Sequence, residues 1–144
     1  MRKFITYLGL IIVVLFTACN KSEIISSDSN TGDQNKVIPE ANIAFDIDID
    51  PGTGKIFNAL SAIQPIVVNV TSTIPPKGIV VDIVTKRAAD SVTVSSNSVS
   101  SSIPKNASTI EGLNSGVLCF TVVTVTSKST STNLLTKSFK IARK

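Results

Sequence analysis

Strict alternation of apolar and polar residues is the feature that most constrains how this chain can fold. Between Ala41 and Asp50 the apolar residues Ile43, Phe45, Ile47 and Ile49 alternate with the acidic residues Asp46, Asp48 and Asp50. A period of two places successive side chains on opposite faces of a β-strand. The Pro-Gly-Thr-Gly sequence of residues 51–54 then marks a turn. This region is therefore predicted to be a half-buried strand that ends in a turn.

Further strands are predicted at short intervals along the chain. They cover residues 66–70, 79–85, 91–94, 116–126 and 134–142, and the last two are predicted to form a hairpin. The Ser-rich run 95–102 permits either an edge strand or a loop. Val122 and Val123 interrupt the period of two, and a β-bulge there would place Leu118, Phe120, Val122 and Val125 on one core face. We find no amphipathic helix, so six to eight short strands within residues 39–144 predict an all-β, antiparallel sandwich.

One short segment suggests which kind of sandwich this is. Residues 113–119, Leu-Asn-Ser-Gly-Val-Leu-Cys, resemble the Leu-x-Pro-Gly-x-x-Tyr segment that enters the penultimate strand of fibronectin type III and other immunoglobulin-like domains. Ser115 replaces the proline and Cys119 the tyrosine, so the tyrosine-corner hydrogen bond is absent. The resemblance implies an immunoglobulin-like β-sandwich.

The N-terminal residues have the pattern of an export signal. Arg2 and Lys3 precede the largely apolar run 4–16. As a helix this run reaches about 20 Å, whereas a bilayer core of about 30 Å needs roughly 20 residues. Residues 15–19, Leu-Phe-Thr-Ala-Cys, resemble the lipobox of bacterial lipoproteins, although Phe16 departs from the usual leucine. The resemblance implies cleavage before Cys19 and lipidation of that residue.

The predicted organisation has three parts: a signal peptide at 1–18, a lipidated Cys19 with a flexible linker to residue 38, and the β-sandwich at 39–144. The linker is rich in Ser, Asp and Asn, a composition that cannot form a packed core. We expect a lipid-anchored protein of the cell envelope. Asn20 stands where an Asp would retain some lipoproteins at the inner membrane, which favours the outer membrane.

Removing residues 1–18 changes the composition that bears on function. The charged residues fall from 14 basic and 10 acidic to 12 and 10, so the side-chain charge is only +2 and gives no argument for a nucleic-acid partner. The only Tyr, Tyr7, is lost, and the chain contains neither His nor Trp. Ser-His-Asp and Cys-His catalysis and His-containing zinc sites are thus excluded. We predict a protein that is not an enzyme, in which Cys119 is a small buried hydrophobe.

Asp46, Asp48 and Asp50 are the candidate metal ligands. On one strand face they would stand about 6.6 to 6.8 Å apart, and calcium could neutralise such a ladder. The EF-hand pattern fails, since Pro51 stands where its glycine belongs. The alternative, which we favour, is a solvated face that discourages edge-to-edge pairing. The same carboxylates could be imagined as a glycosidase pair, but their spacing alone is unspecific.

One modification site is also predicted. Asp90-Ser91-Val92 resembles an Asp-Ser/Thr-apolar sequon at which one group of diderm bacteria O-glycosylates exported proteins. The alternative is a turn residue that caps a strand.

Three functions are compatible with these features. The first is a non-enzymatic interaction, adhesion or assembly role, in which a sandwich edge or loop cluster binds another envelope protein. The second is a glycan-binding module of a nutrient-capture system, assisted by calcium at Asp46, Asp48 and Asp50. The lack of Trp and Tyr in the mature chain counts against it. A small hydrolase is the third.

Overall fold

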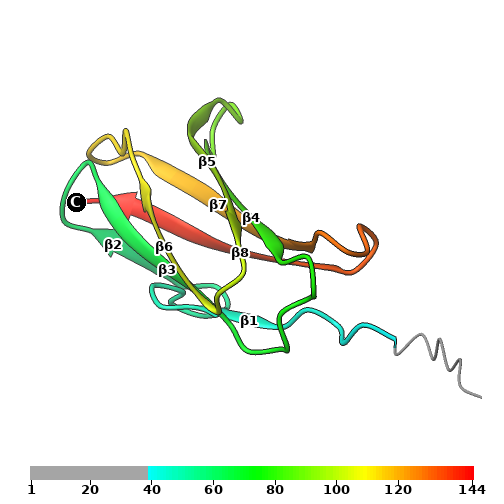
Figure 1. Cartoon of the computed structure of the whole chain (residues 1–144). Coiled ribbons are helices and arrows are strands. Elements are labelled where there is room, and N and C mark those ends of the chain that lie inside the picture. Colours follow the sequence, from blue (N-terminus) through cyan, green and yellow to red (C-terminus); the bar gives the residue numbers. More distant parts are fainter. Residues whose placement is uncertain (1–38) are drawn as a thin grey trace, which may run out of the picture. The chain divides into compact units, whose positions relative to one another are not determined.

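The computed structural model describes residues 39–144, which form an all-β sandwich (Figure 1). The eight strands are β1 (Phe45–Ile47), β2 (Ile56–Ala59), β3 (Gln64–Val70), β4 (Ile79–Arg87), β5 (Thr93–Ser101), β6 (Lys105–Ile110), β7 (Leu118–Ser127) and β8 (Leu134–Arg143). The fold class predicted from the alternation is confirmed. The predicted signal peptide, Cys19 and linker lie outside the described residues.

The strands form two sheets with different orders. The smaller sheet has the order β1-β3-β6 and the larger one β2-β8-β7-β4-β5. All pairings are antiparallel except that of β2 with β8, which is parallel. β2 follows β1 in the chain but belongs to the other sheet, so the loop after β1 carries the chain from one sheet to the other. Gly52 and Gly54 in that loop have φ angles of 85° and 76°, a region that glycine adopts without strain.

The core lies between the facing sides of the two sheets. Its fully buried side chains include Ile66 and Val68 from the smaller sheet and Ile83, Val123 and Ile141 from the larger one. They come from strands far apart in the sequence, so burying apolar surface holds the sheets together.

The predicted alternation around the first strand is confirmed, although the strand is short. Ile43, Phe45 and Ile47 are buried, and Asp46 and Asp48 are exposed. Only residues 45–47 form regular strand. Beyond Ile47, the side chain of Asp48 accepts a hydrogen bond from the Val67 amide at 2.8 Å. The Asp48 side chain thus takes the Val67 amide, which a regular antiparallel ladder would pair with the Asp48 backbone carbonyl.

The predicted inward face of β7 is wrong. Its pairings with β4 and β8 run without a bulge, and Thr121 and Val123 point into the core, whereas Phe120 and Val122 are 40% and 37% exposed. The buried hydroxyl of Thr121 lies 2.9 Å from that of Thr85, directly opposite on β4. This hydrogen bond satisfies both polar groups, so a threonine can occupy the core position that the hydrophobic pattern assigned to phenylalanine.

Two further strands were absent from the sequence prediction, and one ambiguity is resolved. The short strands β2 and β6 were not predicted. The Ser-rich run belongs to β5, an edge strand that pairs with β4 from Ile79 opposite Ser101 to Lys86 opposite Thr93. Its serines alternate with Asn97 and Val99, so the polar sequence still fits a strand with one solvated face.

Candidate functional site

Asp46 lies at the junction between the two sheets. Its carboxylate is 3.0 Å from the ammonium of Lys137 on β8, and that ammonium lies 5.3 Å from the centre of the Phe45 ring. Asp46 is 73% exposed. The lysine therefore links β1 to the larger sheet through an ion pair and a cation–π contact, both accessible to solvent.

Asp48 and Asp50 have other partners. Asp48 accepts the hydrogen bond from Val67, and Asp50 accepts one from the amide of Gly52 at 2.9 Å, which shapes the turn after β1. Within residues 39–144 no three acidic, Cys or His side chains are grouped so that they could hold a metal ion. Asp46 and Asp48 border a shallow hollow with Lys105, whose positive charge opposes a bound cation. Calcium binding at these aspartates stays the less favoured of the two hypotheses, beside a solvated face.

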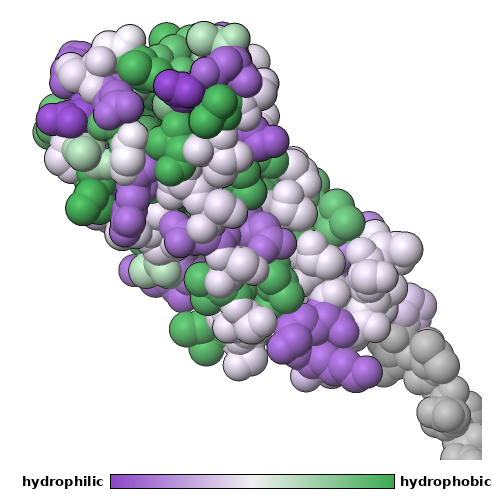
Figure 2. All heavy atoms as spheres, turned by 90° about the horizontal axis from the view of Figure 1, so that it is seen from above, coloured by the Kyte–Doolittle hydropathy of each residue, from purple (hydrophilic) through white to green (hydrophobic). Residues whose placement is uncertain are grey.

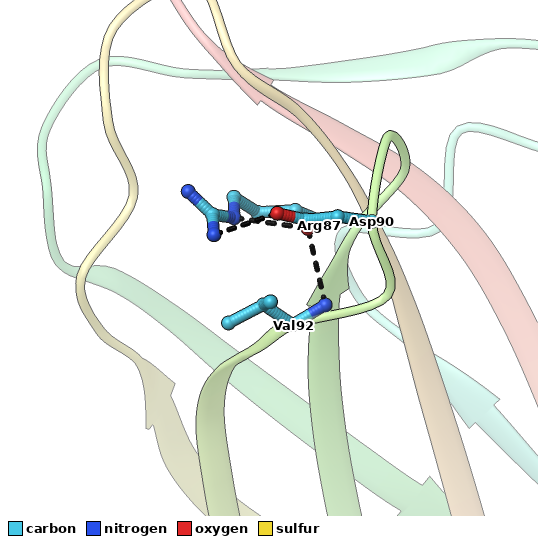
Figure 3. Close-up of polar contacts among 3 residues, drawn as sticks. All are labelled: Arg87, Asp90 and Val92. Carbon is cyan, nitrogen blue, oxygen red and sulfur yellow. Dashed lines mark hydrogen bonds and ion pairs between the residues drawn. The ribbon is translucent and has the colours of Figure 1, made fainter.

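Ser91 lies in the tight turn between β4 and β5. Figure 3 shows the contacts of its neighbours Asp90 and Val92 with Arg87. The carboxylate of Asp90 accepts hydrogen bonds from Arg87 Nε and from the Val92 amide, both at 3.1 Å, and forms an ion pair of 2.8 Å with Arg87. Ser91 is exposed, and its φ of 58° is the only positive value of a non-glycine residue between 39 and 144. The turn thus presents this serine to solvent, and its glycosylation stays a prediction.

Cys119 is 1% exposed and faces the core at the start of β7. Desolvation by burial raises the pKa of its thiol above 9.0, against the opposing charge of Arg87. The neutral thiol is therefore the stable form at physiological pH, which agrees with the role of a small buried hydrophobe.

The outer edge of β5 is the first candidate interaction surface. This strand has nine residues, none charged and none proline. Its backbone pairs only with β4 within the described region, so the groups on its far side have no backbone partner there. Gly112 approaches the carbonyl of Val94, and the side chains of Ser95 and Asn97 bond to residues 111 and 109, so the part of β5 without such contacts begins after Asn97.

The other edge strands are protected in ways that proteins commonly use. β1 has three residues and contains Asp46, and β2 has four and follows Lys55. β6 begins at Lys105 directly after Pro104. β5 is therefore the one long edge in residues 39–144 without a charge or a proline.

The outward face of the larger sheet is the second candidate surface. Phe120 lies between Lys140 on β8 and Lys86 on β4, and Ile56 on β2 lies beyond Lys140 in the same row. The ammonium of Lys140 is 5.8 Å from the centre of the Phe120 ring. On the face seen in Figure 2, hydrophobic residues lie among hydrophilic ones along the domain. An exposed aromatic ring between two cations is the least ordinary part of this surface.

The sequence analysis did not predict that Phe120 faces outward, because it assumed a β-bulge at Val122 and Val123 that would turn Phe120 toward the core. Uninterrupted alternation of Cys119, Thr121 and Val123 would have placed Phe120 outside.

Comparison of this chain with family models, curated proteins and solved structures finds no match. Within residues 39–144, no helix has the length and apolar character needed to cross a membrane.

Proposed function

We propose that this chain is a lipid-anchored protein of the cell envelope, without enzymatic activity, that binds another envelope protein by strand addition along β5. The anchor is supported by the charged, apolar and small residues that precede Cys19 in the order of a lipoprotein signal. The outer membrane is the favoured location, as Asn20 suggests.

The open β5 edge is the observation that carries the interaction part of the proposal. An unprotected edge offers a row of backbone donors and acceptors to an extended segment of a partner. Ser96, Ser98 and Ser100 are exposed along its outward face. Their small, uncharged side chains leave room for a neighbouring strand about 4.8 Å away and repel neither sign of charge.

We also propose that the sandwich is immunoglobulin-like. Leu113 and Cys119 are both 1% exposed, and they lie before and at the start of β7, the penultimate strand. These are the positions that the resemblance of residues 113–119 assigns to the conserved leucine and to the corner residue. The packing of two sheets of mainly antiparallel strands also supports the proposal.

The anchor is tested by replacing the proposed lipid acceptor. Cys19→Ser is expected to abolish incorporation of a labelled fatty acid and to move the protein from the membrane fraction to the soluble fraction. Cys119→Ser is the matched control and is expected to leave lipidation unchanged. Equal labelling of the wild type and Cys19→Ser would disprove lipidation at Cys19.

Strand addition is tested with photo-crosslinking residues placed in the full-length protein in native membranes. A crosslinker at Ser98 is expected to trap one partner protein. A crosslinker at the exposed residue Thr136 is the control, because β8 lies three strands from β5. Ser96→Lys is expected to reduce trapping at Ser98 at least tenfold, since charged side chains protect edges. Equal trapping at Ser98 and Thr136, no trapping, or insensitivity to Ser96→Lys would refute the proposal.

The purified partner must then protect β5. Its addition is expected to slow hydrogen exchange of amides in residues 96–100 more than in β1. Uniform or absent protection would contradict binding at this edge.

Glycan binding is a second candidate function, and one observation favours it. The sequence provides no Trp or Tyr after residue 7, but the structure turns Phe120 outward, where it can serve as the apolar platform that a sugar ring needs.

A further inference from the structure

A hollow on the outward face of the larger sheet combines an aromatic ring with charged and hydroxyl groups. Its volume is about 290 Å³, and its lining includes Asp50, Thr53, Lys55, Phe120, Ser138 and Lys140. The first three come from the loop between β1 and β2, and the others come from β7 and β8. Residues 50–55 thus form one wall, beside the exposed Phe120.

The loop wall is held in place by its own hydrogen bonds. Asp50 accepts the bond from the Gly52 amide, and the Lys55 amide donates to the Gly52 carbonyl at 3.2 Å. Gly52 and Gly54 adopt positive φ, although a side chain at either position would meet open space. The backbone conformation, and not crowding, therefore explains these glycines. A wall already shaped in this way loses little conformational entropy on binding.

The charges of the hollow favour an anionic ligand. Lys55 and Lys140 outnumber Asp50, and Lys86 adds a third cation on the other side of Phe120. The carboxylate of Asp50 can accept hydrogen bonds from ligand hydroxyls, and the hydroxyls of Thr53 and Ser138 can both donate and accept them. The ammonium of Lys140 lies close enough to the Phe120 ring that a ligand bound by both must carry its acidic group next to an apolar face.

We propose that this hollow binds an acidic sugar residue of a polysaccharide. The apolar face of the sugar packs against Phe120, its acidic group pairs with Lys140 and Lys55, and its hydroxyls bond to the polar lining. The volume of the hollow suits one sugar ring, and its aromatic wall, Phe120, is 40% exposed on the outward face of the sheet. The inference gives a site and a ligand class to the glycan-binding candidate, and it is independent of strand addition at β5.

The test is a titration of the full-length protein in detergent micelles, followed by calorimetry. The probes are trigalacturonate, a sulfated galactotriose and neutral galactotriose. Binding of an acidic probe is expected to be at least tenfold tighter than that of the neutral probe and to weaken as salt rises, because exposed ion pairs are screened. Comparison of the carboxylate and sulfate probes shows which acid the site prefers.

Two substitutions locate the site. Phe120→Leu and Lys140→Gln are each expected to weaken binding of the preferred probe at least fivefold. Lys77→Gln removes an exposed lysine from the loop before β4 and is expected to leave affinity unchanged. Thermal unfolding of each variant checks that the fold is retained.

Equal affinity for acidic and neutral probes, no binding of any probe, or unchanged affinity in both site variants would overturn the proposal. None of these results would alter crosslinking from Ser98, so failure here can be distinguished from failure of the proposed protein interaction.

Discussion

Different interactions join the two sheets at the two lateral sides of the sandwich. On the side of β1, the ion pair between Lys137 and Asp46 joins the sheets at 3.0 Å. On the side of β5, the amide of Asn97 donates to the Thr109 carbonyl on β6 at 2.6 Å, and Ser95 Oγ accepts the Glu111 amide at 3.2 Å. We refer to these as the charged side and the neutral side.

This difference separates two tasks that a sandwich edge must perform. Exposed ion pairs contribute about 0 to 1 kcal/mol, but their charges discourage unwanted strand pairing. A neutral hydrogen bond in a partly buried position contributes about 1 kcal/mol and is insensitive to salt. The neutral side can therefore join the sheets without placing charge on β5, which leaves that edge open to a partner.

The largest effect is expected from Gly78→Ala, at the end of the neutral side. Gly78 has a φ of 82°, and an added Cβ would lie 2.5 Å from the carbonyl oxygen of Ser101, the last residue of β5. Backbone strain and this collision together are expected to cost about 2 to 4 kcal/mol in chemical denaturation.

Gly52→Ala is the matched control for Gly78→Ala. Gly52 has a similar φ of 85° but no atom within 4 Å of an added Cβ. It is expected to lose only about 1 kcal/mol from strain. Equal losses in the two variants would show that β5 does not constrain Gly78.

Asn97→Ala is expected to lower the free energy of unfolding by about 1 to 2 kcal/mol, because the Thr109 carbonyl loses its amide donor. The loss should be the same at low and high salt. Asn58→Ala, at an exposed position on β2, is the control and should have little effect. A loss that vanishes in salt would remove the distinction between the two sides.

Asp46→Asn is expected to cost less than about 1 kcal/mol at low salt and almost nothing in 1 M salt, where charges are screened within about 3 Å. The measurement is denaturant unfolding at both salt concentrations. Asp82→Asn provides the comparison, since no described ion pair involves Asp82. A salt-independent loss at Asp46 would mean that its contribution is not electrostatic.

The smallest effect concerns Glu40, in the segment that leads to β1. Hydrogen bonding from Ser127 lowers the pKa of the Glu40 carboxyl below 4.5, with further contributions from Thr130 and Asn133 and with burial opposing them. A lowered pKa in the folded state stabilises the fold above pH 4.5, and this stabilisation is lost as the pH falls through the folded value. Glu40→Gln should therefore flatten the decline of thermal stability below pH 4.5. An identical decline in both proteins would contradict this assignment.

The candidate sites differ in how far local sequence could predict them. The outward position of Asp46 follows from alternation with Ile43, Phe45 and Ile47, whose burial requires the opposite face to be exposed. The burial of Cys119 was also predicted, from its apolar neighbours and the absence of His. The outward Phe120 was not, because the partner that makes Thr121 acceptable in the core is Thr85, 36 residues away.

The open β5 edge depends even more on tertiary pairing. A run of serines has weak strand propensity, and it becomes a strand here because β4 provides a partner along nearly its whole length. Whether a strand lies at an edge is a property of the sheet order, which local sequence does not contain.

The sequence by itself determined the all-β class, which face of the first strand is buried, and the hairpin formed by the last two strands. The reason is that burial of one face imposes a period of two on neighbouring residues. Only the tertiary structure decided that β2 pairs in parallel, that Phe120 faces solvent beside Lys140, and that one edge of β5 has no partner strand within residues 39–144. These outcomes depend on which distant strands become neighbours in a sheet. The neighbouring strand supplies hydrogen-bond partners and packing contacts, and these decide which face of a strand is buried when the two faces are nearly equally hydrophobic.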